Sequence, residues 1–333
     1  MEAEAAQAFR HLSPDTVLDA VESKGYVCNG QLLALNSYEN RVYQVGLEDQ
    51  EPLIAKFYRP ARWTDQTIEE ELTFTTELSS NELPVIAPIA DQHGQCLQHH
   101  GVYRFSLYPR RGGHAPELDN PKHLEQLGRL IARIHNIGAI KPFKQREELT
   151  IESLGELPRV YVLQSGLIPT ELETAYATLT DDVLKLVDTC YQRAGQVASI
   201  RLHGDCHPGN ILNRGEQFYL LDFDDARNGP AIQDLWMFLS GDRRNMTIGL
   251  HDVLEGYSQF RAFNPAELHL IEALRSLRQI HYTAWIAKRW SDPAFPKAFS
   301  WFDTPRYWEN HILELREQMS LLQEAPIVWN GQS

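Results

Sequence analysis

RLHGDCHPGNIL, residues 201–212, places two histidines, an aspartate, a cysteine and an asparagine within eight positions of one another. After a turn at residues 214–216, the apolar strand that follows ends in acids, in the stretch QFYLLDFDDARNGP. Asp205 precedes Asn210 by five residues, and Asp222 follows Asn210 by twelve. We therefore predict two short polar loops that meet, one with a base and a neutral oxygen and the other with an anionic ligand.

This arrangement suits phosphoryl transfer from ATP. The transferred group is already activated, so the protein mainly positions it, neutralises its charge with Mg²⁺ and orients the acceptor hydroxyl. Mg²⁺ prefers hard oxygen ligands and keeps several waters, so one carboxylate and one amide oxygen suffice. A metal hydrolase is the alternative, with His203, Asp205, His207 and Asp222 as zinc or iron ligands. The hydrolase is disfavoured because its reaction gives no role to Lys56, a lysine on a predicted strand far from this stretch in the sequence.

The composition indicates the class of protein. A chain of 333 residues that is 43% hydrophobic exceeds the usual size of one core, so two lobes are expected. The net charge of −14 argues against nucleic acid as a partner. Four scattered cysteines without a CxxC pair, and a start without a basic and then apolar leader, predict a cytoplasmic protein. No apolar run is long enough to cross a membrane, and the expected state is a monomer.

The first third of the chain reads as a β-rich lobe. A short helix is expected within residues 12–26, with Ser13 as its N-cap. Residues 31–60 read as three strands, residues 63–84 as a helix ended by a proline, and residues 84–109 as two more strands. A connector rich in glycine follows these strands.

From residue 121 onward the hydrophobic period becomes that of helices. Residues 123–138 and 170–194 are predicted helices, whereas the weakly patterned residues 141–168 are expected to form a long connection. The C-terminal third contains four tryptophans, at positions 285, 290, 301 and 308. These side chains either pack helices together or form an aromatic site for an ammonium ligand.

The residues in the opening stretch resemble those of a known superfamily. The spacing His-x-Asp-x-x-x-x-Asn at His203, Asp205 and Asn210, with Asp222 after a strand, is similar to the catalytic core of aminoglycoside phosphotransferase-like and protein-kinase-like enzymes. The strings LNSYENRVYQ, AKFYRP, LHGDCHPGNIL, LDFDDARNGPAIQDLWM and RWSDPAFPKAF resemble the bacterial stress response kinase A family over about residues 10–325.

The resemblance implies an α+β, bilobal protein-kinase-like fold. Residues 1–108 would form the ATP-binding lobe, with a five-stranded antiparallel sheet and a helix. Residues 109–333 would form a larger helical lobe for catalysis and substrate binding, with a hinge at about residues 106–113.

It also implies a role for each matching residue. Asp205 and Asp222 would be catalytic, with Asp205 accepting or orienting the proton of the acceptor hydroxyl. Asn210 and Asp222 would bind Mg²⁺. Lys56, at the end of the strand LIAKFY, would hold the α and β phosphates of ATP.

Further nucleotide contacts are implied at four positions. A glutamate on the following helix would pair with the lysine, and Glu71 is preferred while Glu70 stays open. Ser37 lies in NSYENR, where kinases carry the loop that covers the phosphates. Backbone groups from Ser106 to Tyr108, after the strand GVYRF, would form the hinge that reads adenine.

The sequence departs from protein kinases in two ways that carry information. NSYENR contains no glycine, so polar side chains would replace some of the backbone contacts to phosphate. Gly204 stands where many regulated kinases have an arginine, and only 12 residues separate Asp222 from Asp234, so no long activation loop is expected. Asp234 either binds backbone amides of the catalytic loop or caps a helix.

Other polar residues near these motifs have plain structural interpretations. His203 and His135 are expected to be hydrogen-bonded structural residues. Of Asp224 and Asp225, one would contact a second Mg²⁺ and the other would be a solvated acid.

The expected function is that of a serine/threonine protein kinase of bacterial stress survival, which uses ATP and Mg²⁺ and phosphorylates proteins, including itself. A small-molecule kinase for choline or an aminoglycoside is one alternative. A catalytically silent nucleotide-binding module is the other, but such a module needs no base like Asp205.

Overall fold

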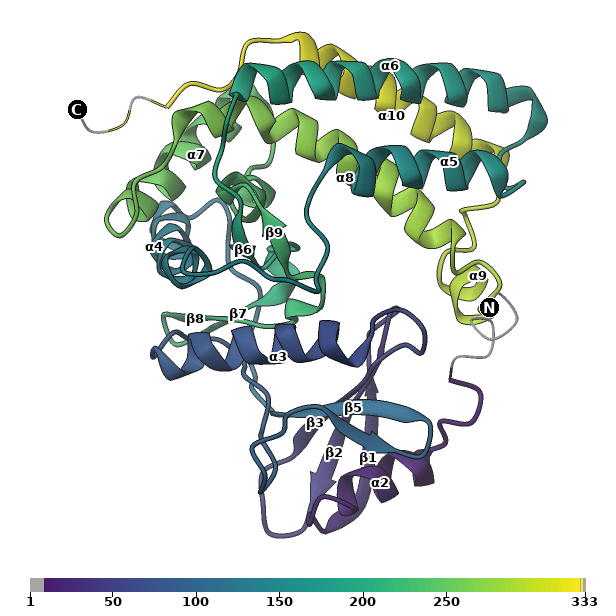
Figure 1. Cartoon of the computed structure of the whole chain (residues 1–333), viewed down its shortest axis with the longest axis vertical. Coiled ribbons are helices and arrows are strands. Elements are labelled where there is room, and N and C mark those ends of the chain that lie inside the picture. The colour runs from purple at the N-terminus through teal and green to yellow at the C-terminus, as the bar shows by residue number, and fades with distance from the viewer. Residues whose placement is uncertain (1–8, 330, 332–333) are drawn as a thin grey trace. The chain divides into compact units, whose positions relative to one another are not determined.

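The computed structural model describes residues 9–329 and residue 331 (Figure 1). The chain divides into two compact units. Unit 1 comprises Met1–Ala115 and Gly209–Asp224, and unit 2 comprises Pro116–Pro208 and Asp225–Ser333.

Unit 1 is built on a five-stranded sheet with the order β1-β2-β3-β5-β4. Its strands are β1 (Cys28–Leu35), β2 (Arg41–Leu47), β3 (Leu53–Phe57), β4 (Gln98–His100) and β5 (Tyr103–Pro109). Every neighbouring pair is antiparallel, which confirms the predicted sheet. β3 and β5 are adjacent, with Lys56 opposite Ser106.

Two helices accompany the sheet, α2 (Pro14–Glu22) and α3 (Asp65–Ser80). As predicted, the side chain of Ser13 accepts a hydrogen bond from the amide of Thr16 at the start of α2. α3 buries an apolar face that includes Ile68 and Leu72, and Glu71 is buried with them. A carboxylate on the buried face of a helix requires a partner.

A hairpin from far along the chain completes unit 1. β7 (Ile211–Arg214) and β8 (Gln217–Leu220) pair with each other, and Leu220 exchanges backbone hydrogen bonds with the segment after α3. The amide of Ile86 donates to Leu220 at 2.8 Å, and the amide of Leu220 donates to Pro84 at 3.0 Å. This pairing places Asp222, two residues after β8, in the same unit as the sheet.

Unit 2 is mainly helical. Its helices are α4 (Pro121–Gly138), α5 (Leu157–Gln164), α6 (Thr170–Ala194), α7 (Arg243–Ser258), α8 (Ile271–Ala287), α9 (Ala294–Ala298) and α10 (Pro305–Gln323). α4 packs on α7, and α6 lies along α10 (Figure 1). Two short strands, β6 (Ile200–Leu202) and β9 (Arg227–Gly229), form an antiparallel pair. A 3₁₀ helix at Ala231–Asp234 follows β9.

The prediction of one long connection over residues 141–168 is wrong in part. A π-helical turn at Glu152–Glu156 leads directly into α5. The apolar pattern is weak because few side chains of this segment are buried, among them Leu154 and Val162. Its backbone instead approaches its neighbours at Gly155, where an added Cβ would lie 2.5 Å from a methyl group of Leu184.

Within the part of the chain that the structure describes, no helix combines the length and the apolar character needed to cross a bilayer.

Candidate active site

Lys56 lies at the centre of a cluster of buried charges in unit 1. Its Nζ is 2.8 Å from an oxygen of Asp222, 3.5 Å from Asp224 and 3.7 Å from Glu71. Burial alone would lower the pKa of Lys56, but these three carboxylates together raise it well above its ordinary value. The lysine is therefore positively charged and fixed in position at neutral pH.

Each partner of Lys56 comes from a different element. Glu71 is 2% exposed on the inner face of α3, and it forms the ion pair with Lys56. The sequence had left Glu70 open as the other candidate for this pair. Asp222 follows β8 with a φ of 60°, a conformation that few residues other than glycine adopt, and about half of its side chain is exposed. Asn210 lies beside this segment, because its carbonyl accepts from the amide of Leu221 at 3.1 Å. Asp222 and Asn210 thus offer hard oxygens on neighbouring segments of unit 1.

Two arginines of this site were not identified from the sequence. Arg62 forms ion pairs with Asp224 and with Glu39 of the NSYENR loop. The Nε of Arg59 lies 3.1 Å from a carboxylate oxygen of Glu39 and donates to the carbonyl of the same residue at 2.9 Å. No local pattern marks these arginines, because their partners come from other segments.

The loop at residues 36–40, between β1 and β2, is held in place by side chains. Asn40 accepts a hydrogen bond from the amide of Arg59 at 3.1 Å, and the carbonyl of Tyr38 accepts from the Arg59 guanidinium at 3.3 Å. Ser37 is half-buried in this loop. Arg59 therefore holds this loop, which contains no glycine, through three successive residues.

The placement of Ser106 and Tyr108 after a strand is wrong. Both lie within β5, which continues to Pro109 and pairs with β3 along this whole length. Ser106 is fully buried and donates to the carbonyl of Cys96 at 3.0 Å, and the hydroxyls of Tyr58 and Tyr108 are 3.3 Å apart. The strand ends at Pro109 because proline has no amide donor for the ladder. The connector to unit 2 therefore starts at Arg110.

In unit 2, the segment that leads to Asp205 is held by a buried carboxylate. Asp234 accepts hydrogen bonds from the amides of His203 and Gly204, both at 2.8 Å. It also lies 3.1 Å from Nε2 of His135. The interpretation of Asp234 as a ligand of loop amides is therefore confirmed. Burial would raise the pKa of Asp234, but the neighbouring His135 contributes most to lowering it below its ordinary value.

The backbone geometry of this loop requires glycine at position 204. Its φ is 85°, and an added Cβ would lie 2.1 Å from the carbonyl oxygen of Asp225. Only glycine fits this close approach. The arginine of regulated kinases is therefore excluded at this position.

The carboxylate of Asp205 has a partner at each oxygen. Nε2 of His207 lies 3.4 Å from one oxygen, and Arg278 of α8 donates to the other. Burial would raise the pKa of Asp205, but His207 and Arg278 hold it well below its ordinary value. Arg278 stands 73 residues further along the chain, so no local motif predicts it.

The two acids after Asp222 have different environments. Asp224 is buried in the Lys56 cluster of unit 1. Asp225 begins the second segment of unit 2 and lies 3.3 Å from Arg227. Asp224 is therefore a structural part of the charge cluster, whereas the sequence did not distinguish its environment from that of Asp225.

All four C-terminal tryptophans pack against other aromatic rings. Trp308 is completely buried beside Tyr176 and Phe302, and Trp285 packs on Phe295. Trp301 is 43% exposed. This packing supports the structural interpretation of these residues.

Comparison with known proteins gives a consistent result. The family model described as phosphotransferase enzyme family matches residues 31–271. Serine/threonine protein kinase RdoA of Salmonella typhimurium (strain LT2) is 42% identical over 322 residues, which are 97% of each chain. Stress response kinase A of Escherichia coli (strain K12) has the same identity and coverage.

Solved structures show the same fold. The amicoumacin kinase hAmiN has a TM-score of 0.71 at 19% identity, covering 93% of this chain and 94% of its own. A microcompartment-associated aminopropanol kinase has a TM-score of 0.68 at 20% identity, covering 91% and 98%. These likenesses confirm the predicted kinase-like architecture.

Proposed function

The chain belongs to the phosphotransferase enzyme family and is a relative of stress response kinase A, and from this premise we propose that it is a protein kinase. It transfers the γ-phosphoryl group of ATP to serine and threonine hydroxyls of proteins, its own included. Mg²⁺ is the proposed metal. The single observation that carries the proposal is the buried Lys56 with its three carboxylates.

A fixed, charged lysine is a ligand for the α and β phosphates of ATP. In the cluster, the cations Lys56 and Arg62 face the carboxylates of Glu71, Asp222 and Asp224. The carboxylates are in excess, so the cluster favours an additional cation.

Asp222 and Asn210 fit the oxygen preference of Mg²⁺ and would hold it. When bound, the metal neutralises the phosphate charge that develops during transfer.

Asp205 is proposed to orient the acceptor hydroxyl. Because its pKa is lowered, it is ionised at neutral pH and accepts a hydrogen bond from the hydroxyl. Such a carboxylate is a weak base, which suffices because the transition state of phosphoryl transfer is loose. The hydroxyl oxygen forms the new bond to phosphorus as the bond to ADP breaks, and the proton passes to Asp205.

Two observations support a protein acceptor over a cationic alcohol such as choline. The relatives that share 42% identity include one named as a serine/threonine protein kinase. In addition, Arg278 contacts Asp205 and would repel an ammonium group there.

The test is transfer from γ-labelled ATP with Mg²⁺ to a generic protein substrate, to the enzyme itself and to a panel of amino alcohols and aminoglycosides. We expect label on protein serine or threonine that is lost by at least about a thousandfold in Asp205→Ala. Asp303→Ala, which removes an exposed aspartate, is the matched control and should retain full transfer.

Label that appears only on a small amino alcohol would assign the small-molecule alternative. No label that depends on Asp205 would favour the silent nucleotide-binding module. The cytoplasmic location, the monomeric state and the division at residue 108 stay predictions.

A further inference from the structure

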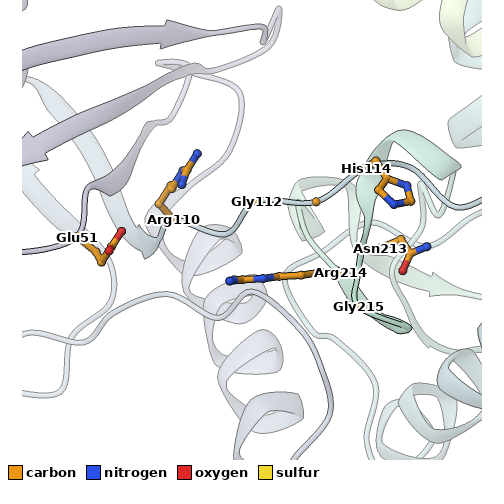
Figure 2. A pocket seen from close by; sticks show the side chains of 8 residues that line it. Glu51, Arg110, Gly112, His114, Asn213, Arg214 and Gly215 are labelled. Carbon is orange, nitrogen blue, oxygen red and sulfur yellow. The ribbon is translucent and has the colours of Figure 1, made fainter.

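A separate cavity of about 600 Å³ lies in unit 1. It is lined by Arg110 and His114 of the connector, Glu51 of the loop between β2 and β3, and Asn213 and Arg214 of the β7–β8 hairpin. Figure 2 shows Glu51 and Arg110 on one side, His114 and Asn213 on the other, and Arg214 extending between them. None of these residues belongs to the Lys56 cluster. Its volume lies within the range of small-molecule sites.

The charge of this cavity differs from that of the whole chain. Arg110 and Arg214 contribute two positive charges and Glu51 one negative charge, in a protein whose net charge is −14. Among the described residues, neither guanidinium has a hydrogen bond or ion pair, whereas Arg59 and Arg62 of the same unit are paired with acids. Two arginines without partners on facing segments are available to an anion.

A buried polar atom in the wall gives an independent indication of a ligand. Asn213 is 7% exposed, and its Oδ1 has no hydrogen-bond partner among the described residues. Its backbone is satisfied, because it exchanges hydrogen bonds with His114 at 2.7 and 3.2 Å. A buried acceptor without a partner is costly, and a ligand with a hydroxyl donor, such as the P–OH group of a hydrogen phosphate, would satisfy it.

The walls are held together without any ligand. An added Cβ at Gly113 would lie 2.9 Å from the carbonyl oxygen of Asn213 and 2.9 Å from Cβ of Leu212, so glycine permits the connector to approach the hairpin. The cavity is therefore preformed, which lowers the entropic cost of binding.

We propose that this cavity, which shares no residue with the Lys56 cluster, is a binding site for a small phosphate dianion that keeps one P–OH group. Guanidinium groups match phosphate oxygens through pairs of parallel hydrogen bonds, and two of them neutralise a dianion. Asn213 supplies the neutral contact, and the site is independent of the phosphoryl-transfer proposal.

The test is calorimetric titration of the full chain with inorganic phosphate, without divalent metal, in a mildly alkaline buffer where the dianion with one P–OH group predominates. We expect saturable binding that weakens at least tenfold in Arg110→Gln/Arg214→Gln. Arg111→Gln is the control, because it removes one positive charge from a neighbour whose guanidinium lies over the ring of Tyr219, and its affinity should stay within twofold.

A second variant tests the sign of the charge effect. Glu51→Gln removes the one acid of the site and should strengthen phosphate binding about threefold. Thermal unfolding verifies that each variant is folded. If the double variant is unfolded, the affinity of Glu51→Gln for phosphate tests the proposal instead. The proposal is overturned if the wild type does not bind phosphate, or if the double variant binds it as tightly as the wild type. It is also overturned if Arg111→Gln loses as much affinity as the double variant, or if Glu51→Gln does not bind phosphate more tightly than the wild type.

Discussion

A lysine that is 6% exposed would be neutral in an apolar environment, and it keeps its charge in this protein because carboxylates surround it. Glu71 contributes the most deeply buried of these carboxylates. Its loss would leave Lys56 less well oriented for phosphate, although Asp222 and Asp224 would keep the lysine charged.

Glu71→Gln should therefore lower kcat/KM for ATP by about 10- to 100-fold, with the larger change in KM. Glu70→Gln, one residue away on the half-buried side of α3, is the control and should change kcat/KM by less than twofold. Steady-state kinetics at varied ATP concentration measures both. Equal losses in the two variants would contradict the assignment of Glu71 as the partner of Lys56.

Glu267 makes the stability of unit 2 depend on pH. It accepts a hydrogen bond from the amide of Ile232 at 2.9 Å, and burial raises its pKa to about 7 from an ordinary value of 4.5. Below pH 4.5 both the folded and the unfolded states carry the proton. As the pH rises to 7, the unfolded state releases its proton first, so the free energy of unfolding falls by roughly 3 kcal/mol.

Glu267→Gln should remove this dependence. Urea unfolding at pH 5 and pH 8, followed by tryptophan fluorescence, measures the free energy of unfolding of both proteins. We expect the wild type to lose more stability than the variant over this interval. The same loss in both proteins would show that Glu267 does not retain its proton in the fold.

At the scale of elements, the crossing of α4 and α7 depends on two glycines. An added Cβ at Gly128 would lie 2.0 Å from the carbonyl oxygen of Val253, and one at Gly256 would lie 1.9 Å from that of Glu125. The backbones of the two helices are therefore in direct contact. This crossing also positions His135 of α4, which contacts Tyr257 of α7 at 2.9 Å and Asp234 at 3.1 Å.

Gly128→Ala should reduce the free energy of unfolding by about 3 kcal/mol, because rigid backbone blocks the new methyl group. Gly249→Ala on α7 is the control, since its Cβ would meet atoms no closer than 3.6 Å. That substitution should stabilise the helix by about 0.5–1 kcal/mol. Denaturant unfolding of the two variants should give changes of opposite sign, and a stable Gly128→Ala would mean that the helices can separate at little cost.

At the scale of the whole molecule, the proposed nucleotide ligands and the proposed catalytic aspartate belong to different units. Lys56 and Asp222 belong to unit 1, whereas Asp205 belongs to unit 2. Substitutions at these positions should therefore separate nucleotide affinity from phosphoryl transfer.

ATP with Mg²⁺ at 100 times its Kd should stabilise the protein by about 2.7 kcal/mol and raise Tm by a few degrees. Asp205→Ala should keep this rise, whereas Lys56→Met should lose it. Differential scanning fluorimetry with and without a metal chelator measures the shift. A rise that persists in Lys56→Met would place the nucleotide elsewhere.

Local signals in the sequence were sufficient for most of the elements and for the polar loops. Ser13 marked the start of α2, and the three strands of residues 31–60 were correctly identified, because these features depend on neighbours within a few residues. The spacing from Asp205 to Asp222 predicted the family. The end of β5 was misplaced because strand pairing with β3, rather than local composition, carries it to Pro109.

Only the tertiary structure decided which distant side chains meet. Arg278 at Asp205, Arg62 at Asp224 and the arginine pair of the second cavity come from segments far apart in the chain. Charged groups act over several ångströms whatever their separation in sequence, and no periodicity records such an approach. The sequence by itself therefore determined the fold class and the family, and the packing of the elements determined the electrostatic environment of the residues in the candidate sites.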